Sequence, residues 1–222
     1  MSAQTPPTPR LLLVDGSSYL YRAFFAGGES MSTTLSDGTV LKTGAIRIMI
    51  NMMQKLLNDY PSTYAACVFD AKGPTFRDAI YPEYKAHRPP MPDDLRSQIE
   101  PIHEVVKLLG WPVLEVPGIE ADDAIGTLAR VAAESGHRVV ISTGDKDLAQ
   151  LVNPHVSLIN TMAKPPEVLD IPGVVAKFGV PPELIIDYLT LIGDTVDNVP
   201  GVEKVGPKTA VKWLQEHGTL AA

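Results

Sequence analysis

The chain has 222 residues, of which 45% are hydrophobic and 20% charged, and its formal net charge is −7. This composition is typical of a globular protein and excludes a disordered or fibrous chain. No apolar run approaches the roughly 18 residues that a membrane span needs, so we expect no membrane-spanning helix. The single cysteine, Cys67, excludes an internal disulfide and a cysteine-based zinc site.

The chain starts with a polar, proline-rich segment that has no apolar stretch of the kind found in signal peptides. Residues 1–10 are therefore predicted to be a disordered tail. We expect a cytoplasmic protein.

Apolar runs that alternate with helical periodicity predict an α/β fold. Strands are expected at 11–14, 65–69, 113–116, 138–142 and 156–160. Helices are expected at 46–57, 95–109 and 121–135. Pro101 is expected to kink or split the second helix, and Gly136 to end the third. The alternation predicts a doubly wound, mostly parallel sheet.

Two segments lack this periodicity. Residues 26–43 are rich in Gly, Ser and Thr and are predicted to form a loop. Residues 71–92 mix basic residues with tyrosines and prolines, and no spacing would let the segment bury one face. We therefore expect it to be an excursion from the edge of the sheet.

The chain becomes helical after about Pro165. Helices are predicted at 182–192 and 208–216, on either side of a connection rich in Gly and Asp. The expected organisation is an α/β domain over 11–165 and a helical region over 166–222.

Acidic residues follow the predicted strands. They are Asp15, Asp70, Glu120, Asp122, Asp123, Asp145 and Asp147, and Asp194 and Asp197 stand in the helical region. Taken alone, each is more often a turn former or a helix cap than a ligand. Their shared position is informative, because the carboxyl ends of parallel strands meet in one crevice. Nine carboxylates need cations to stay ionised together, and an all-oxygen set favours Mg²⁺ or Mn²⁺ over Zn²⁺.

Six ordered motifs resemble a known family. They lie at 14–22, 68–72, 84–88, 118–123, 142–147 and 193–201. They are similar to the bacterial 5′-3′ exonuclease and flap endonuclease family, and most of all to its members that form the N-terminal nuclease domain of bacterial DNA polymerase I. The resemblance implies a three-layer α/β/α, PIN-like fold with a mostly parallel sheet, a helical arch within 71–100 and a C-terminal helix-three-turn-helix.

The resemblance also implies a function: a structure-selective 5′-3′ exonuclease and 5′ flap endonuclease that hydrolyses DNA in primer removal and repair. It implies two metal ions, the first held by Asp15, Asp70, Glu120 and Asp122 and the second by Asp145, Asp147, Asp194 and Asp197, with Asp123 as an acidic neighbour. Two ions about 4 Å apart can activate a water and stabilise the leaving oxygen. No side-chain nucleophile is then required.

Basic residues complete the implied site. Lys85 and Arg88 match arch residues that reach the substrate phosphate, and they are the predicted catalytic cations. Further DNA contacts are predicted at Arg22, Arg77, Tyr84, Gly201, Val202, Gly206, Lys208 and Thr209. Without the motif, Lys85 and Arg88 would be assigned to a solvated face, and the C-terminal glycines would fit a structural helix hairpin equally well. The resemblance further implies K⁺ at the helix-three-turn-helix.

The net charge does not argue against DNA. Removing the nine carboxylates from the 26 acidic residues leaves fewer acidic than the 19 basic residues. The expected partners are DNA with a 5′ flap, a nick or a 5′ end and a covalently linked polymerase, with no membrane, for a monomer associated with the nucleoid. Residues 26–43 differ from the loop usual in polymerase-linked members, and the chain ends soon after 208–216, so we expect a fragment.

Two rival functions remain open at this point. A non-catalytic module that binds DNA structures would be expected to lack several of the carboxylates. A related sheet-based RNA nuclease would not need Lys85, Arg88 or the C-terminal hairpin.

Overall fold

The computed structural model describes residues 10–28, 31–161 and 163–221. The predicted tail over 1–9 lies outside the described residues. Arg10, which was assigned to that tail, already begins the first strand. In the described part of the chain, none of the helices combines the length and apolar character needed to cross a membrane.

Six strands form the central sheet, in the order β5-β4-β1-β6-β7-β8. They are β1 (Arg10–Asp15), β4 (Tyr64–Phe69), β5 (Val113–Glu115), β6 (Arg138–Ser142), β7 (Val156–Asn160) and β8 (Glu167–Leu169). The first five are parallel and confirm the five predicted strands, whereas β8 is antiparallel to β7. The sheet therefore continues beyond the predicted domain end at 165, because buried Leu169 pairs with Leu158.

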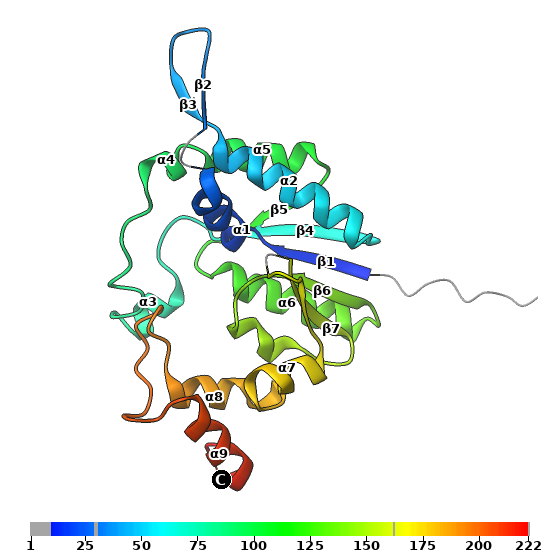
Figure 1. Cartoon of the computed structure of the whole chain (residues 1–222), viewed down its shortest axis with the longest axis vertical. Helices are drawn as coiled ribbons and strands as arrows, with labels where there is room; N and C mark the ends of the chain where they lie inside the picture. Colours follow the sequence, from blue (N-terminus) through cyan, green and yellow to red (C-terminus); the bar gives the residue numbers. More distant parts are fainter. Residues whose placement is uncertain (1–9, 29–30, 162, 222) are drawn as a thin grey trace, which may run out of the picture.

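Helices cover both faces of the sheet (Figure 1). They are α1 (Gly16–Ala23), α2 (Gly44–Asp59), α3 (Phe76–Ile80), α4 (Asp93–Arg96), α5 (Ile99–Leu108), α6 (Ala121–Glu134), α7 (Ile171–Phe178), α8 (Ile185–Ile192) and α9 (Pro207–His217), with a π-helical turn at Phe24–Gly28 and 3-10 helices at Asp147–Leu151 and Pro182–Leu184. Helices α1, α2 and α5 pack on one face, and α6, α7 and α8 on the other. This three-layer arrangement confirms the predicted fold class.

The alternation of side chains along β1 explains the two cores. Leu12 and Val14 are buried against α1, α2 and α5, whereas Leu13 is buried on the opposite face against α6. Successive residues of a strand point to opposite faces, so a strand covered on both sides has a continuous apolar sequence.

The segment predicted as a loop over 26–43 contains a hairpin. Strands β2 (Ser32–Thr34) and β3 (Val40–Lys42) pair antiparallel, and the hairpin projects from the body in Figure 1. Its side chains are mostly exposed, so no alternation of apolar and polar residues marks it in the sequence.

The helix predicted over 95–109 is split into α4 and α5 at Ser97 and Gln98. The break comes before Pro101, which lies in the first turn of α5. There its missing N–H removes no hydrogen bond of the helix.

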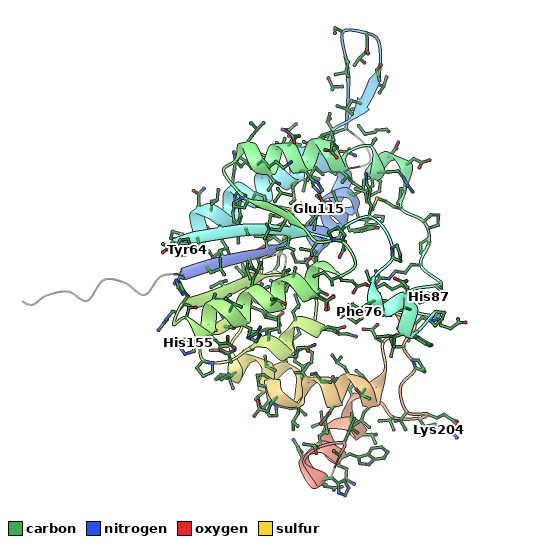
Figure 2. The ribbon with its side chains drawn as sticks, turned by 180° about the vertical axis from the view of Figure 1, so that it is seen from behind. Tyr64, Phe76, His87, Glu115, His155 and Lys204 are labelled. Carbon is green, nitrogen blue, oxygen red and sulfur yellow. The ribbon has the colours of Figure 1, made fainter. Side chains whose placement is uncertain are left out.

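Residues 71–92, which we call the arch segment, cross the carboxyl end of the sheet. Figure 2 shows Phe76 and His87 on the opposite side of the molecule from Tyr64, at the start of β4, and His155. The segment holds only the short helix α3 and a run of turns. It is tied to the C-terminal loop (residues 193–206), because the Lys85 N–H donates to the Asp197 carbonyl at 3.0 Å and the Asn198 amide to the Glu83 carbonyl at 2.7 Å.

The C-terminal loop joins α8 to α9, as predicted for the hairpin. It turns back tightly where Gly193 and Gly201 meet: a Cβ on either would overlap backbone atoms of the other side, and Gly193 has a φ of 72°. This packing explains why both positions are glycine.

Candidate active site

Asp15 occupies the junction of β1 and α1. Its carboxylate accepts the Ser18 N–H at 2.9 Å and the Thr143 hydroxyl at 2.8 Å, and the side chain is buried, with the residue 4% exposed. The first bond caps the N-terminus of α1, which begins directly after β1. A Cβ on Gly16 would lie 2.7 Å from the Phe69 ring, so glycine lets this helix pack directly on the sheet.

The first turn of α6 carries the next acidic cluster. Asp70, after β4, accepts the Ala121 N–H at 2.8 Å and so joins the end of the strand to the helix. Glu120 caps the N-terminus of α6. The Asp123 carboxylate accepts the Glu120 N–H at 3.0 Å, which completes a capping box. These bonds fix the backbone that carries Asp122.

Six of the nine predicted carboxylates line one crevice of about 230 Å³. They are Asp15, Asp70, Glu120, Asp122, Asp145 and Asp197, and Lys85 and Arg88 line the same crevice. A neighbouring cavity of about 390 Å³ shares Glu120, Asp122 and Asp197 and adds Asp123 and Asp147. Asp194 lies on the C-terminal loop, next to Lys146 from the loop after β6.

Five of the nine carboxylates make no ion pair with the described residues: Asp15, Asp70, Asp122, Asp145 and Asp147. In three of them, Asp15, Asp122 and Asp147, burial raises the pKa, and we call these three the uncompensated group. Burial raises the pKa of Asp15 to about 6 and that of Asp122 to about 8, and the neighbouring carboxylates add to both shifts. Burial and the charge of Asp145 raise the pKa of Asp147 to about 6. Its Oδ1 is buried without a hydrogen-bond partner. This group is short of positive charge.

Three other carboxylates, which we call the paired group, are neutralised by the chain itself. Glu120 binds the Lys85 ammonium at 2.7 Å, Asp197 binds Arg88, and Asp194 binds Lys146 at 2.8 Å. Although burial opposes it, the bond from Lys146 lowers the pKa of Asp194.

Tyr84 links two members of the paired group. Its hydroxyl lies 3.0 Å from Glu120 and 3.0 Å from Asp197. Burial and these two carboxylates raise the pKa of Tyr84, so the phenol keeps its proton and donates it to them.

The donor set fits divalent cations in its chemistry. It consists of carboxylate oxygens, and the orphaned oxygen of Asp147 is the kind of buried group that a cation would satisfy. Within 10–28, 31–161 and 163–221, however, no three His, Cys, Asp or Glu side chains stand in a geometry that could already hold a metal ion. In the paired group, Lys85, Arg88 and Lys146 each bind a carboxylate oxygen.

Two family models match the chain. Residues 10–179 match the N-terminal resolvase-like domain of 5′-3′ exonucleases, and residues 180–222 match their C-terminal SAM fold. The chain belongs to the 5′-3′ exonuclease family. The two matches meet 14 residues after the division predicted at 165, so the family's first domain includes β8 and α7.

Curated relatives agree with this assignment. The chain is 46% identical over 210 residues to the 5′-3′ exonuclease of Aquifex aeolicus, covering 95% of this chain and 70% of that protein. It is 58% identical over 204 residues to DNA polymerase I of Pseudomonas aeruginosa, covering 92% of this chain and 22% of the polymerase. The chain thus spans about a fifth of the polymerase's length.

Solved structures of nucleases share the fold. The zinc-bound T5 5′-exonuclease matches with a TM-score of 0.75 and 21% identity, over 96% of this chain and 77% of that one. The catalytic core of Rad2, described in complex with DNA substrate, matches with a TM-score of 0.63 and 18% identity, over 96% and 62%.

The predicted DNA contacts of this exonuclease-family chain differ in how the structure places them. Arg22 donates to Asn160 at 3.4 Å and packs against Gly144, on the loop that carries Asp145. Arg77 is predicted to bind a phosphate, yet its guanidinium makes two bonds to Asp123, at 2.6 and 2.8 Å. Asp123 is thereby turned to the neighbouring cavity.

The hairpin residues predicted to contact DNA differ in accessibility. Gly201 is required by packing inside the hairpin rather than by approach to a phosphate, whereas a Cβ on Gly206 would meet nothing within 4 Å. Gly206 caps α9, and the amides of Lys208 and Thr209 lie in the first turn beyond Pro207. Val202 is 47% exposed. Lys208 makes no ion pair with any residue that the structure describes, so its ammonium is available.

Sequence reasoning missed Lys146 and Thr143. Lys146 stands between two predicted ligands, and a lysine between two aspartates is itself a sign of local charge compensation. Thr143 carries no such signal, because its bond to Asp15 depends on the pairing of β1 with β6.

Proposed function

We propose that this chain is a Mg²⁺- or Mn²⁺-dependent 5′ nuclease that hydrolyses phosphodiester bonds of DNA carrying a 5′ flap, a nick or a free 5′ end. The observation that carries the proposal is the crevice in which six carboxylates lie with Lys85 and Arg88. The carboxylates come from the end of β1, from the loops after β4 and β6, from the start of α6 and from the C-terminal loop. Such a site combines an all-oxygen cation site with cations suited to a phosphate.

Two groups of residues would hold two ions. Asp15, Asp70, Glu120 and Asp122 would form the first site, and Asp145, Asp147, Asp194 and Asp197 the second. We do not assign Asp123 to either site, because Arg77 engages both of its oxygens. When bound, the ions supply a water of lowered pKa for attack on phosphorus and positive charge for the leaving 3′ oxygen.

The arch segment supplies the other half of the chemistry. Lys85 and Arg88 would exchange their carboxylate partners for the phosphate oxygens of the substrate, which they can steady as negative charge develops. Lys85 has a φ of 55°, an unfavourable backbone conformation for a lysine, and its N–H is held by the Asp197 carbonyl. The backbone therefore aims this side chain at the crevice.

The hairpin is proposed to bind the duplex part of the substrate. The amides of the first turn of α9 and the Lys208 ammonium suit a phosphate, and such contacts are independent of base sequence. We also propose K⁺ at this hairpin and a monomeric enzyme, and the DNA polymerase I relatives support a linked polymerase in a longer protein.

The test is cleavage of a labelled 5′-flap DNA by the purified chain in Mg²⁺, with an RNA flap of the same sequence and an EDTA reaction as controls. We expect cleavage of the DNA flap in Mg²⁺ only. Cleavage of RNA at an equal rate would favour the RNA nuclease. Binding of the flap without cleavage in Mg²⁺ or Mn²⁺ would favour the non-catalytic module.

A further inference from the structure

Arg77 stands between the arch segment and α6. Its Nη1 and Nη2 each donate to a different oxygen of Asp123, which is the bidentate geometry of a guanidinium with a carboxylate. The two side chains are 30% and 25% exposed. This is a fixed pair rather than a loose surface contact.

The Arg77–Asp123 pair also contacts the N-terminus of α6. Asp123 Oδ2, which accepts from Arg77, also accepts the Glu120 N–H at 3.0 Å. The Glu120 side chain then points into the crevice, where Lys85 and Tyr84 bind it. A chain of bonds therefore runs from α3, through Asp123, to a proposed metal ligand.

A second contact ties the start of α3 to the same region. The Phe76 N–H donates to the Gly118 carbonyl at 3.1 Å, and the Arg77 guanidinium stacks over the Phe76 ring at 4.6 Å. The arch segment is thus anchored beside the turn that leads into α6. A phosphate could bind Arg77 only by breaking the bonds to Asp123.

We propose that Arg77 is a positioning residue, not a DNA contact: it holds Asp123 so that the first turn of α6 presents Glu120 and Asp122 to the metal ions. This inference rests on the proposed function, since it concerns the same site. A guanidinium is needed because an ammonium cannot bridge both oxygens of Asp123 with fixed geometry.

The experiment measures Mn²⁺ affinity by electron paramagnetic resonance for the wild type and for R77M, R77K, D123N and the double variant R77M/D123N. Loss of the Arg77 charge by itself should tighten cation binding. Loss of positioning should instead weaken it, by about 10- to 100-fold, as for other groups that orient metal ligands. We expect weakening in R77M, R77K and D123N, with the double variant no worse than R77M because the pair acts as a unit.

Arg130 gives a matched control. Arg77 and Arg130 both line the cavity of about 390 Å³. Among the residues that the structure describes, however, the ion-pair partner of Arg130 is Glu134 alone, at 2.9 Å, within the exposed part of α6. R130M should bind Mn²⁺ like the wild type. Affinity for flapped DNA in EDTA, and its dependence on salt, should be the same in R77M and R130M.

The proposal is overturned if R77M and R77K keep the wild-type Mn²⁺ affinity and lose DNA affinity, with the slope of log affinity against log salt reduced by about one. Circular dichroism checks folding, and R77K with D123N decides the question if R77M does not fold. Failure of the proposed function gives a different result. In that case the wild type would show no Mn²⁺ binding that is lost in D122N.

Discussion

The uncompensated and the paired carboxylates lie within one small region, yet they are neutralised in different ways. Asp15, Asp122 and Asp147 have only hydrogen bonds or no partner, and burial raises the pKa of each. Glu120, Asp194 and Asp197 each bind a lysine or arginine of the chain. The protein therefore supplies its own cations to the paired group, whereas the uncompensated group has none among the described residues.

This difference implies that the two groups of carboxylates have different roles. The uncompensated group is where an added cation gains most, because it relieves repulsion between buried charges. The ion pairs of the paired group tie the arch segment and the C-terminal loop to the carboxyl end of the sheet. We propose that substrate or metal replaces the lysine and arginine partners. The variants below change one group at a time.

The largest effect is expected from D145N/D147N, which removes charge from the second proposed metal site. Cleavage of a flapped DNA should fall by about a thousand-fold or more, since metal stabilisation of the leaving oxygen is worth several kcal/mol. DNA affinity measured by fluorescence anisotropy should be retained. Turnover close to that of the wild type would contradict the assignment of these two residues.

K85A distinguishes the effect of Lys85 on the cleavage rate from its effect on metal affinity. Without the lysine, the phosphate loses a stabilising cation, and the single-turnover rate at saturating DNA should fall by about 100-fold. Mn²⁺ affinity should not fall, because Glu120 is relieved of a competing cation. A normal rate at saturating DNA would show that the arch segment only guides the strand.

The uncompensated group predicts how stability depends on pH. Because the pKa of Asp122 in the folded state, about 8, lies above the ordinary aspartate value of 3.8, the folded state binds more protons than the unfolded state. The resulting stability is present below about pH 4 and is lost as the pH rises towards 8. D122N lacks this term, so in EDTA its Tm relative to the wild type should rise between pH 5 and pH 8, by about 2–4 °C for each 1 kcal/mol of repulsion removed.

Calorimetry in EDTA measures this difference directly. K208A serves as a control, because Lys208 is exposed and lies outside the crevice. A Tm difference between D122N and the wild type that is constant with pH would show that Asp122 is not held among repelling charges.

The smallest effect concerns the hairpin, which is separate from both carboxylate groups. K208A should reduce the slope of log affinity against log salt by about one for substrates that contain duplex, because one phosphate contact is lost. Single strands should be unaffected. Equal losses on single strands and duplexes would show that duplex recognition lies elsewhere.

The sequence predicted the sheet and the convergence of the carboxylates because both follow from simple geometry. Continuous apolar runs mark buried parallel strands, and the residues just after them share one edge of the sheet. Asp15, Asp70 and Asp145 needed no further information.

The direction of individual side chains could not be predicted in the same way. Asp122 and Asp123 are neighbours in sequence, but successive residues of a helix differ by about 100° in direction. Asp122 therefore lines the crevice while Asp123 turns to Arg77. The direction of Asp123 depends on the position of α3, which carries Arg77, and no local sequence pattern predicts that position.

Contacts between loops that are far apart in the chain could not be predicted from the sequence either. Lys146 and Asp194 lie 48 positions apart in the sequence, and only the fold brings them together. Likewise, Gly201 is explained by its packing on Gly193 and not by a substrate.

The central claim is that the crevice is completed by two divalent ions. Its most direct test is to count the Mn²⁺ ions bound per chain by electron paramagnetic resonance, in the wild type and in D145N/D147N. We predict two ions in the wild type and one in the variant, with the remaining ion lost in D122N/D145N/D147N. Equal Mn²⁺ binding by all three proteins, or none by the wild type, would contradict the account.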